Sequence, residues 1–118
     1  MGTSYNGNFG KTKGKKDYLR GLSEDKQGKH IVGHKNYIEG RSIFDGTIDD
    51  AIKLVNKFDG KGTSIGQGKE RVDFGKVIGY YVDKATGRKY PTTVGIIHVS
   101  KDGKHIVPAR PKNFGGDK

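Results

Sequence analysis

The sequence predicts an α+β fold in which one helix packs on a twisted, mainly antiparallel β-sheet. One segment has helical periodicity, and several β-rich runs separated by turn signals follow it. The last two runs are joined by Asp-Gly, the strongest short-range signal for a β-hairpin. Because the amphipathic helix has to bury its apolar face, the sheet is expected to cover it.

Residues 1–25 are rich in glycine, lysine, asparagine and serine and show little periodicity. Such a composition cannot bury enough apolar surface to order the chain, so a flexible basic linker is predicted. The folded domain is therefore expected to span residues 26–114. Near its start, residues 29–32 are predicted to form a short strand or the lead into one.

The helix is predicted in the segment that follows Gly46. Thr47 is a suitable N-cap, and Asp49 and Asp50 stand in the first turn, where negative charge suits the helix dipole. Gly60 or Gly62 is expected to end the helix. The apolar stripe at helical spacing consists of Ile48, Ala51, Ile52, Val55 and Phe58.

Strands are predicted over most of the remaining chain. The glycine-rich stretch KGTSIGQGKE, residues 61–70, is expected to be a flexible connection from the helix to the first of them. Residues 84–87 are predicted to form a turn. The predicted strands before the final hairpin turn cover residues 71–74, 77–82 and 90–100.

The final hairpin, GIIHVSKDGKHIVPARP, contains two of the four histidines of the chain. If Asp102 and Gly103 form a two-residue turn, Ser100 lies opposite His105. Side chains alternate between faces along a strand, and directly paired residues share a face. His98 is then predicted to lie on the same exposed face as Ser100 and His105. The core face is predicted to carry Ile97, Val99 and Ile106.

The net charge of +10 and the pI near 9.8 indicate a polyanionic partner, which could be nucleic acid, an anionic membrane or an acidic protein. No apolar run approaches the roughly 18–20 residues that span a bilayer, and no signal-peptide pattern opens the chain, so no membrane anchor is expected. The chain has no cysteine, which excludes disulfides, thiolate catalysis and cysteine-based zinc sites.

Histidine and cations occur together in two clusters that are far apart in the sequence. Metal-free RNA cleavage needs a base for the 2′-OH proton, an acid for the leaving 5′ oxygen and donors that stabilise charge on phosphorus. The two clusters contain all of these groups, so no cofactor is expected. A structural alternative stays open, in which the hairpin histidines only face water on the open side of the sheet.

Other functional templates fit the sequence less well. His30 and His34 are four residues apart, but Gly28 and Gly33 disfavour a helix there, so no metal site is predicted. The glycines after the predicted helix lack the context and the terminal GK[ST] of a phosphate-binding loop. No Gly-x-Ser-x-Gly elbow is present for a serine hydrolase.

Several spaced motifs, KQGKHI, GRS, KERVDFGKVIGYYVD, TTVGIIH and HIVPARP, occur in order over roughly residues 26–111. In these the chain resembles the bacterial polymorphic toxin type 50 family. Members are the C-terminal domains of large secreted proteins and are predicted ribonucleases. They are assigned to the metal-independent barnase–EndoU–colicin–RelE group, so the resemblance implies that fold and a ribonuclease toxin domain over residues 26–114.

The resemblance and the chemistry together indicate the candidate site residues. His34 ranks lower than the other histidines, because the family motif is not expected to hold a histidine there. The predicted catalytic residues are His30, His98, His105, Arg41, Ser100 and Thr93. The predicted RNA- or phosphate-binding residues are Lys29, Ser42, Arg71 and Lys104.

The leading hypothesis is a secreted bacterial toxin domain that is delivered into the cytoplasm of a target cell. There it would cleave RNA, either tRNA or rRNA, by 2′-OH attack that leaves a 2′,3′-cyclic phosphate. An acidic cognate immunity protein is the expected partner, since opposite charge speeds capture of a basic toxin. The alternatives are a non-catalytic basic nucleic-acid-binding module and a metal-dependent DNase toxin.

Overall fold

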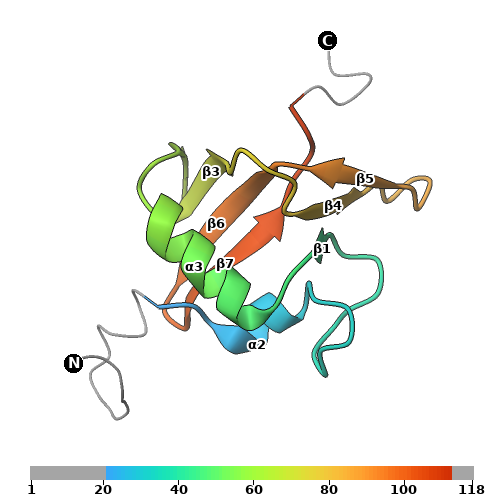
Figure 1. Cartoon of the computed structure of the whole chain (residues 1–118), viewed down its shortest axis with the longest axis horizontal. Helices are drawn as coiled ribbons and strands as arrows, with labels where there is room; N and C mark the ends of the chain where they lie inside the picture. The colour runs from blue at the N-terminus through green and yellow to red at the C-terminus, as the bar shows by residue number, and fades with distance from the viewer. Residues whose placement is uncertain (1–20, 113–118) are drawn as a thin grey trace.

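A computed structural model describes residues 21–112, so residues 1–20 of the predicted linker lie outside the described part. The chain forms short helices and antiparallel strands (Figure 1), which confirms the predicted α+β class. The elements in order are α2 (Glu24–Gly28), β1 (Ile43–Phe44), α3 (Ile48–Phe58), β2 (Thr63–Gly66), β3 (Lys69–Asp73), β4 (Gly79–Val82), β5 (Lys89–Thr92), β6 (Val94–Ser100) and β7 (Gly103–Pro108).

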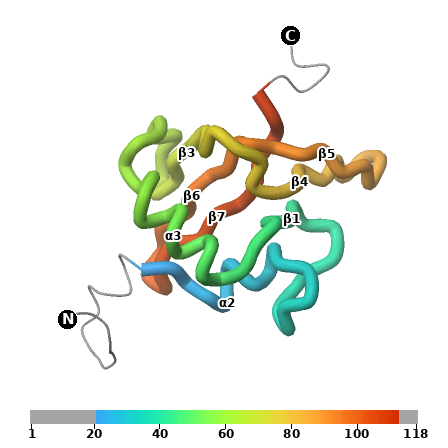
Figure 2. Tube along the Cα trace, viewed as in Figure 1, coloured from blue at the N-terminus to red at the C-terminus, as the bar shows by residue number. Residues whose placement is uncertain are grey.

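The strands form two sheets, whereas the sequence predicted one. The larger sheet has the order β2-β3-β6-β7 and the smaller has the order β1-β4-β5. The break falls inside the predicted strand over residues 90–100, because β5 ends at Thr92 and β6 starts at Val94. The Thr92 Oγ1 accepts a hydrogen bond from the Val94 amide at 3.1 Å, which closes a local bend. In Figure 2 the β4–β5 pair extends away from the end of the larger sheet.

Helix α3 begins and ends close to where the sequence predicts. The Thr47 hydroxyl accepts from the Asp50 amide at 3.1 Å, and the Asp50 carboxylate accepts from the Thr47 amide at 2.9 Å. This capping box satisfies two amides at the helix start. Gly60 follows the helix with a φ of +85°. One stripe prediction is wrong: Ile52 is 37% exposed, and Leu54 packs on the core in its place.

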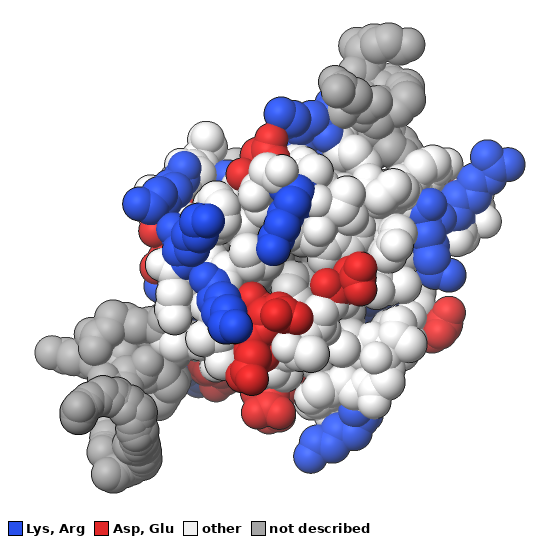
Figure 3. All heavy atoms as spheres, in the orientation of Figure 1, with Lys and Arg blue, Asp and Glu red and all other residues white. Residues whose placement is uncertain are grey.

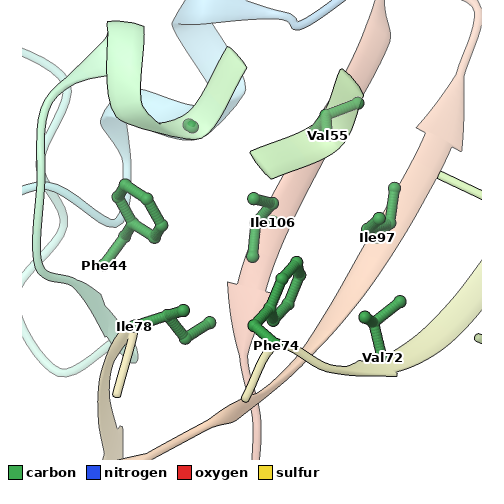
Figure 4. Packing of buried hydrophobic residues seen from close by; sticks show 8 residues of the cluster. Phe44, Val55, Val72, Phe74, Ile78, Ile97 and Ile106 are labelled. Atoms are coloured by element: carbon green, nitrogen blue, oxygen red, sulfur yellow. The ribbon is translucent and has the colours of Figure 1, made fainter. Parts of the chain in front are cut away.

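The hydrophobic core lies between α3 and one face of the larger sheet (Figure 4). Ile97 and Ile106 are cross-strand partners and are both fully buried. Phe58 from α3 meets Phe74 edge-to-face with ring centroids 4.9 Å apart. The core cluster consists of Phe44, Ala51, Val55, Val72, Phe74, Ile78, Ile97 and Ile106. Because α3 covers this face, the other face of the sheet is left for the histidines.

The β6–β7 turn lies one residue earlier than predicted, since Ser100 pairs with Gly103 and His98 pairs with His105. When the turn moves by one residue, the cross-strand partner of every residue changes by two positions. Side chains alternate with a period of two, so the predicted face is kept: His98, Ser100 and His105 still share it. The prediction that Val99 joins the core is wrong, because it lies near the turn and is 42% exposed.

Two further predictions about local structure are corrected. Residues 29–32 form turns after α2 and no strand. The glycine-rich stretch after α3 contains strand β2, which pairs antiparallel with β3. Gln67 and Gly68 have φ values of +54° and +73°, so they form a tight turn between two strands instead of a flexible link. Within residues 21–112, no helix is long and apolar enough to cross a bilayer.

Candidate active site

The open face of the larger sheet carries a cross-strand row of Lys69, His98 and His105, one residue from each of β3, β6 and β7. The rings of His98 and His105 lie with their centroids 4.9 Å apart and their planes at 42°. The two imidazoles are therefore direct neighbours, as their shared face requires.

A third imidazole reaches this row from the other end of the described chain. His30 lies in the turns that follow α2, and its ring stacks on that of His105 at a centroid distance of 5.8 Å and an angle of 24°. The residue is only 4% exposed. Its Nδ1 lies 2.9 Å from the backbone oxygen of Ser42 and 3.3 Å from the Ser42 hydroxyl. Three of the four histidines of the chain thus form one cluster.

Gln27 holds the loop that carries His30 against the sheet. Its side chain is fully buried, donates to the backbone oxygen of Ile106 at 3.0 Å and accepts from the Ile106 amide at 2.7 Å. The amide thus pairs with the free edge of β7 as a neighbouring strand would. The backbone amide of His30 in turn donates to the backbone oxygen of Gln27 at 3.0 Å. On the other strand, Ile106 directly follows His105. The two hydrogen bonds between Gln27 and Ile106 therefore hold His30 next to His105.

The histidine cluster opens into a cleft of about 1020 Å³. Its charged lining is strongly biased towards cations: it comprises Lys26, Lys29, Arg41, Arg71, Lys84 and Arg110 against Glu39 and Asp83. The α3 side of the molecule differs, since acidic side chains gather there among the lysines (Figure 3). The cleft is therefore suited to a polyanion.

The comparison with protein families gives a match to the model described as bacterial toxin 50, over residues 22–108. The chain belongs to the bacterial toxin 50 family. The matched range runs from the residues before α2 to the end of β7, so all three clustered histidines of the toxin domain lie within it. A comparison with curated proteins found no match.

The surroundings of the three imidazoles in the toxin domain all lower their pKa values and so favour the neutral rings. Burial lowers the pKa of His30 below its usual value, and the nearby cations Arg41 and Lys29 lower it further. Burial also lowers the pKa of His98, with a smaller contribution from Lys69. The pKa of His105 falls to about 3, first through burial and then through its two histidine neighbours. A bound anion would oppose these effects.

Hydrogen bonds distinguish the two ring nitrogens of the buried histidines. A carbonyl oxygen can only accept, so the His30 Nδ1 carries the hydrogen that is donated to Ser42. In a neutral ring the Nε2 atom of His30 then keeps its lone pair. The buried Nδ1 of His105 has no hydrogen-bond partner among the described residues. The Nε2 atom of His30 therefore retains a lone pair for a ligand, whereas the Nδ1 of His105 is shielded from solvent.

Three of the predicted site residues lie outside the cleft of the toxin domain. Ser100 donates to the Gly103 oxygen at 3.1 Å within the β6–β7 turn. The Thr93 side chain hydrogen-bonds to Asp73. Lys104 is 8% exposed and forms an ion pair with Asp59. These side chains stabilise turns and the sheet–helix contact.

The remaining predicted residues line the cleft: they are Lys29, Arg41, Ser42 and Arg71. Lys26 also lines it but was missed, since nothing in the sequence distinguishes it from the other lysines. Gln27 was missed because its partner Ile106 is 79 residues away. His34 lies apart, where its Nδ1 accepts from the Asn36 amide at 3.0 Å.

The three clustered histidines do not form a recognisable set of metal ligands. Over residues 21–112, no group of three or more histidine, aspartate or glutamate side chains is arranged to hold a metal ion. The carboxylates of the cleft, Glu39 and Asp83, come from the loop before β1 and from the end of β4.

Proposed function

We propose that the toxin domain is a metal-independent endoribonuclease that cleaves RNA by attack of a 2′-OH on the adjacent phosphorus. The observation that carries this proposal is the convergence of His30, His98 and His105 in a cationic cleft. Proton transfer to and from two oxygens of one phosphodiester needs two titratable groups within reach of each other. Imidazole is the side chain best suited to that exchange near neutral pH.

His30 acts as the general base. Its Nδ1 hydrogen is held by Ser42, so its Nε2 has a lone pair free to take the proton of the 2′-OH. The lowered pKa keeps the ring unprotonated before the reaction. As the proton moves to Nε2, the bond from O2′ to phosphorus forms.

His98 acts as the general acid, because it is the least buried imidazole of the cluster and exchanges protons with solvent most easily. The substrate phosphate raises its pKa by placing negative charge beside it, so the ring is protonated in the complex. It gives this proton to O5′ as the P–O5′ bond breaks. The products are a 2′,3′-cyclic phosphate and a 5′-hydroxyl.

His105 and the cations stabilise the charge that builds on the phosphoryl oxygens. His105 lies between the other two rings. Its Nδ1 is buried, so the N–H that donates to a phosphate oxygen is the one on Nε2. Lys29 and Arg41 lie beside His30 and supply positive charge, while Arg71 binds a neighbouring phosphate. The proposal assigns no catalytic or binding role to Ser100, Thr93 or Lys104, whose side chains have structural partners.

The wider biology is proposed from the family and the charge. Membership of a bacterial toxin family supports secretion and delivery into the cytoplasm of a target cell, with tRNA or rRNA as the substrate. The α+β fold with antiparallel sheets supports assignment to the barnase–EndoU–colicin–RelE group. A producing cell needs protection from a basic active site, and an acidic immunity protein that covers the cleft would supply it.

The decisive experiment incubates the protein with tRNA, rRNA and plasmid DNA in the presence of EDTA. The wild-type protein is expected to cut RNA, and His30→Ala and His105→Ala are expected to lower the rate about 10²- to 10⁴-fold. His34→Ala is the matched control, since it removes the one histidine outside the cluster. A cyclic phosphate on the product, detected by mass spectrometry, is the expected end.

The other outcomes separate the alternatives. RNA binding without cutting would identify a nucleic-acid-binding module. Cutting of DNA that stops in EDTA would identify a metal-dependent DNase. RNA cutting that survives both cluster variants would refute the assignment of the site.

A further inference from the structure

The cleft has a second half with a different chemical character from the histidine cluster. Tyr81 enters it from β4, and the guanidinium carbon of Arg110 lies 6.0 Å from the centre of its ring. The floor beside them is formed by Ile96 and Val107, which are cross-strand partners and are half-buried. This half therefore combines an aromatic ring, a guanidinium and an apolar surface.

The two halves are one step apart along the strands. Arg71, Ile96 and Val107 form a cross-strand row on β3, β6 and β7, two residues from the row that contains His98 and His105. Both rows face the cleft, because side chains two residues apart share a face, and they are about 6.7 Å apart along the strand. That separation is similar to the span of the one sugar that lies between a phosphate and its base.

A nucleobase has the complementary chemistry, with apolar π faces and polar edges. Aromatic rings and guanidinium groups stack on bases of any sequence, and β-branched side chains can pack against their edges. Arg71 is anchored at the rim through its donation to the Arg110 oxygen at 3.3 Å, so a cation lies beside the apolar floor. Phosphate-binding and base-stacking groups therefore follow each other along one groove.

We propose that this half of the cleft, formed by Tyr81, Ile96, Val107 and Arg110, is a stacking subsite for a nucleobase next to the scissile phosphate. A base that is paired in a duplex is stacked on both sides and cannot enter such a subsite. The substrate class is therefore single-stranded RNA or an unpaired loop. This inference rests on the proposed function for its substrate, and it adds which form of RNA is taken.

The test measures binding instead of cleavage. The probe is a short, fluorescently labelled single-stranded 2′-fluoro RNA, which lacks the attacking hydroxyl, and its partner is an oligomer of equal length without bases. At one fixed ionic strength, Tyr81→Ala is expected to weaken binding of the base-bearing oligomer about 5- to 100-fold. It is expected to leave binding of the base-free oligomer and of the matching duplex unchanged.

Three variants control this measurement. Tyr81→Phe keeps the ring and is expected to bind as wild type, whereas Tyr81→Leu keeps apolar bulk without the π face and is expected to weaken binding. Tyr80→Ala changes the adjacent tyrosine, whose side chain points to the other face of β4 and does not line the cleft, so it is expected to have no effect. If Tyr81→Ala does not fold, the comparison of Phe with Leu still decides the question.

Equal weakening of the base-bearing and base-free oligomers, or no weakening of either, would overturn the subsite. The two proposals can fail separately. If the protein cleaves RNA in EDTA but binding depends neither on Tyr81 nor on the base, the ribonuclease proposal stands and the subsite proposal fails. If binding depends on Tyr81 and on the base but ordinary RNA is not cleaved, the subsite proposal stands and the ribonuclease proposal fails.

Discussion

The two faces of the β6–β7 hairpin differ sharply, although their residues are adjacent in the sequence. The pair Ile97–Ile106 is fully buried beneath α3, while the next pair, His98–His105, faces the cleft. One set of backbone hydrogen bonds fixes both pairs, because the register that places the isoleucines in the core also brings the imidazoles together. Stability and the proposed chemistry therefore depend on different side chains of the same strands, and substitutions can separate them.

The largest expected change in stability comes from the core face. Ile97→Ala removes a fully buried side chain and should lower the free energy of unfolding by about 2–5 kcal/mol. In a domain of this size the melting temperature should fall by about 10 °C or more. The rate of RNA cleavage per folded molecule should stay close to that of wild type, as measured well below the melting temperature.

The cleft face should respond in the opposite way. His105→Ala should abolish most cleavage while lowering the melting temperature less than Ile97→Ala does, since the Nδ1 of His105 has no partner to lose among the described residues. Thermal unfolding and single-turnover cleavage of both variants provide the comparison. Equal losses of stability and rate in both variants would mean that the two faces are not separable.

A smaller loss of stability is expected at Gln27, which holds the loop of His30 against the edge of β7. Gln27→Leu leaves the amide and the oxygen of Ile106 without their buried partner, which should cost about 1–3 kcal/mol. Cleavage per folded molecule should also fall, because His30 is no longer held against His105. Ile97→Ala is the matched control, since it lowers stability without moving His30. A loss of stability with an unchanged cleavage rate would restrict Gln27 to holding the edge of β7.

An effect of similar size is expected in the dependence of stability on pH. The pKa of His105 is near 6.5 in the unfolded chain and about 3 in the folded one, so only the unfolded chain takes up this proton between those values. The stabilising effect is complete above pH 6.5 and is lost as the pH falls, by about 1.4 kcal/mol per pH unit for each proton. His105→Asn should flatten the fall in melting temperature between pH 7 and pH 5.

That window is chosen to exclude the carboxylates. The pKa of Asp73 is lowered from 3.8 to about 2, chiefly by its hydrogen bond from Lys112, so its effect on stability is confined to pH values below about 4. His34→Ala serves as the control for a histidine outside the cluster. An unchanged slope in His105→Asn would show that the ring titrates in the folded protein as it does in the unfolded chain.

The sequence by itself determined the features whose signals lie within a few residues of each other. The start of α3 follows from Thr47 and Asp50, and its end follows from Gly60, because capping and left-handed backbone are local properties. The face shared by His98 and His105 was also predictable. This prediction holds although the turn was placed one residue too late, because side chains alternate between the faces of a strand with a period of two.

The tertiary structure alone decided that His30 joins the other two imidazoles. That contact depends on Gln27 pairing with Ile106 across 79 residues, and no local pattern encodes which strand edge a buried amide will find. The division into two sheets at Thr93 was not predicted either, because residues 90–100 read as one continuous β-rich run. Packing selects among strand pairings that have similar local energies, so the site exists only once the distant segments have been brought together.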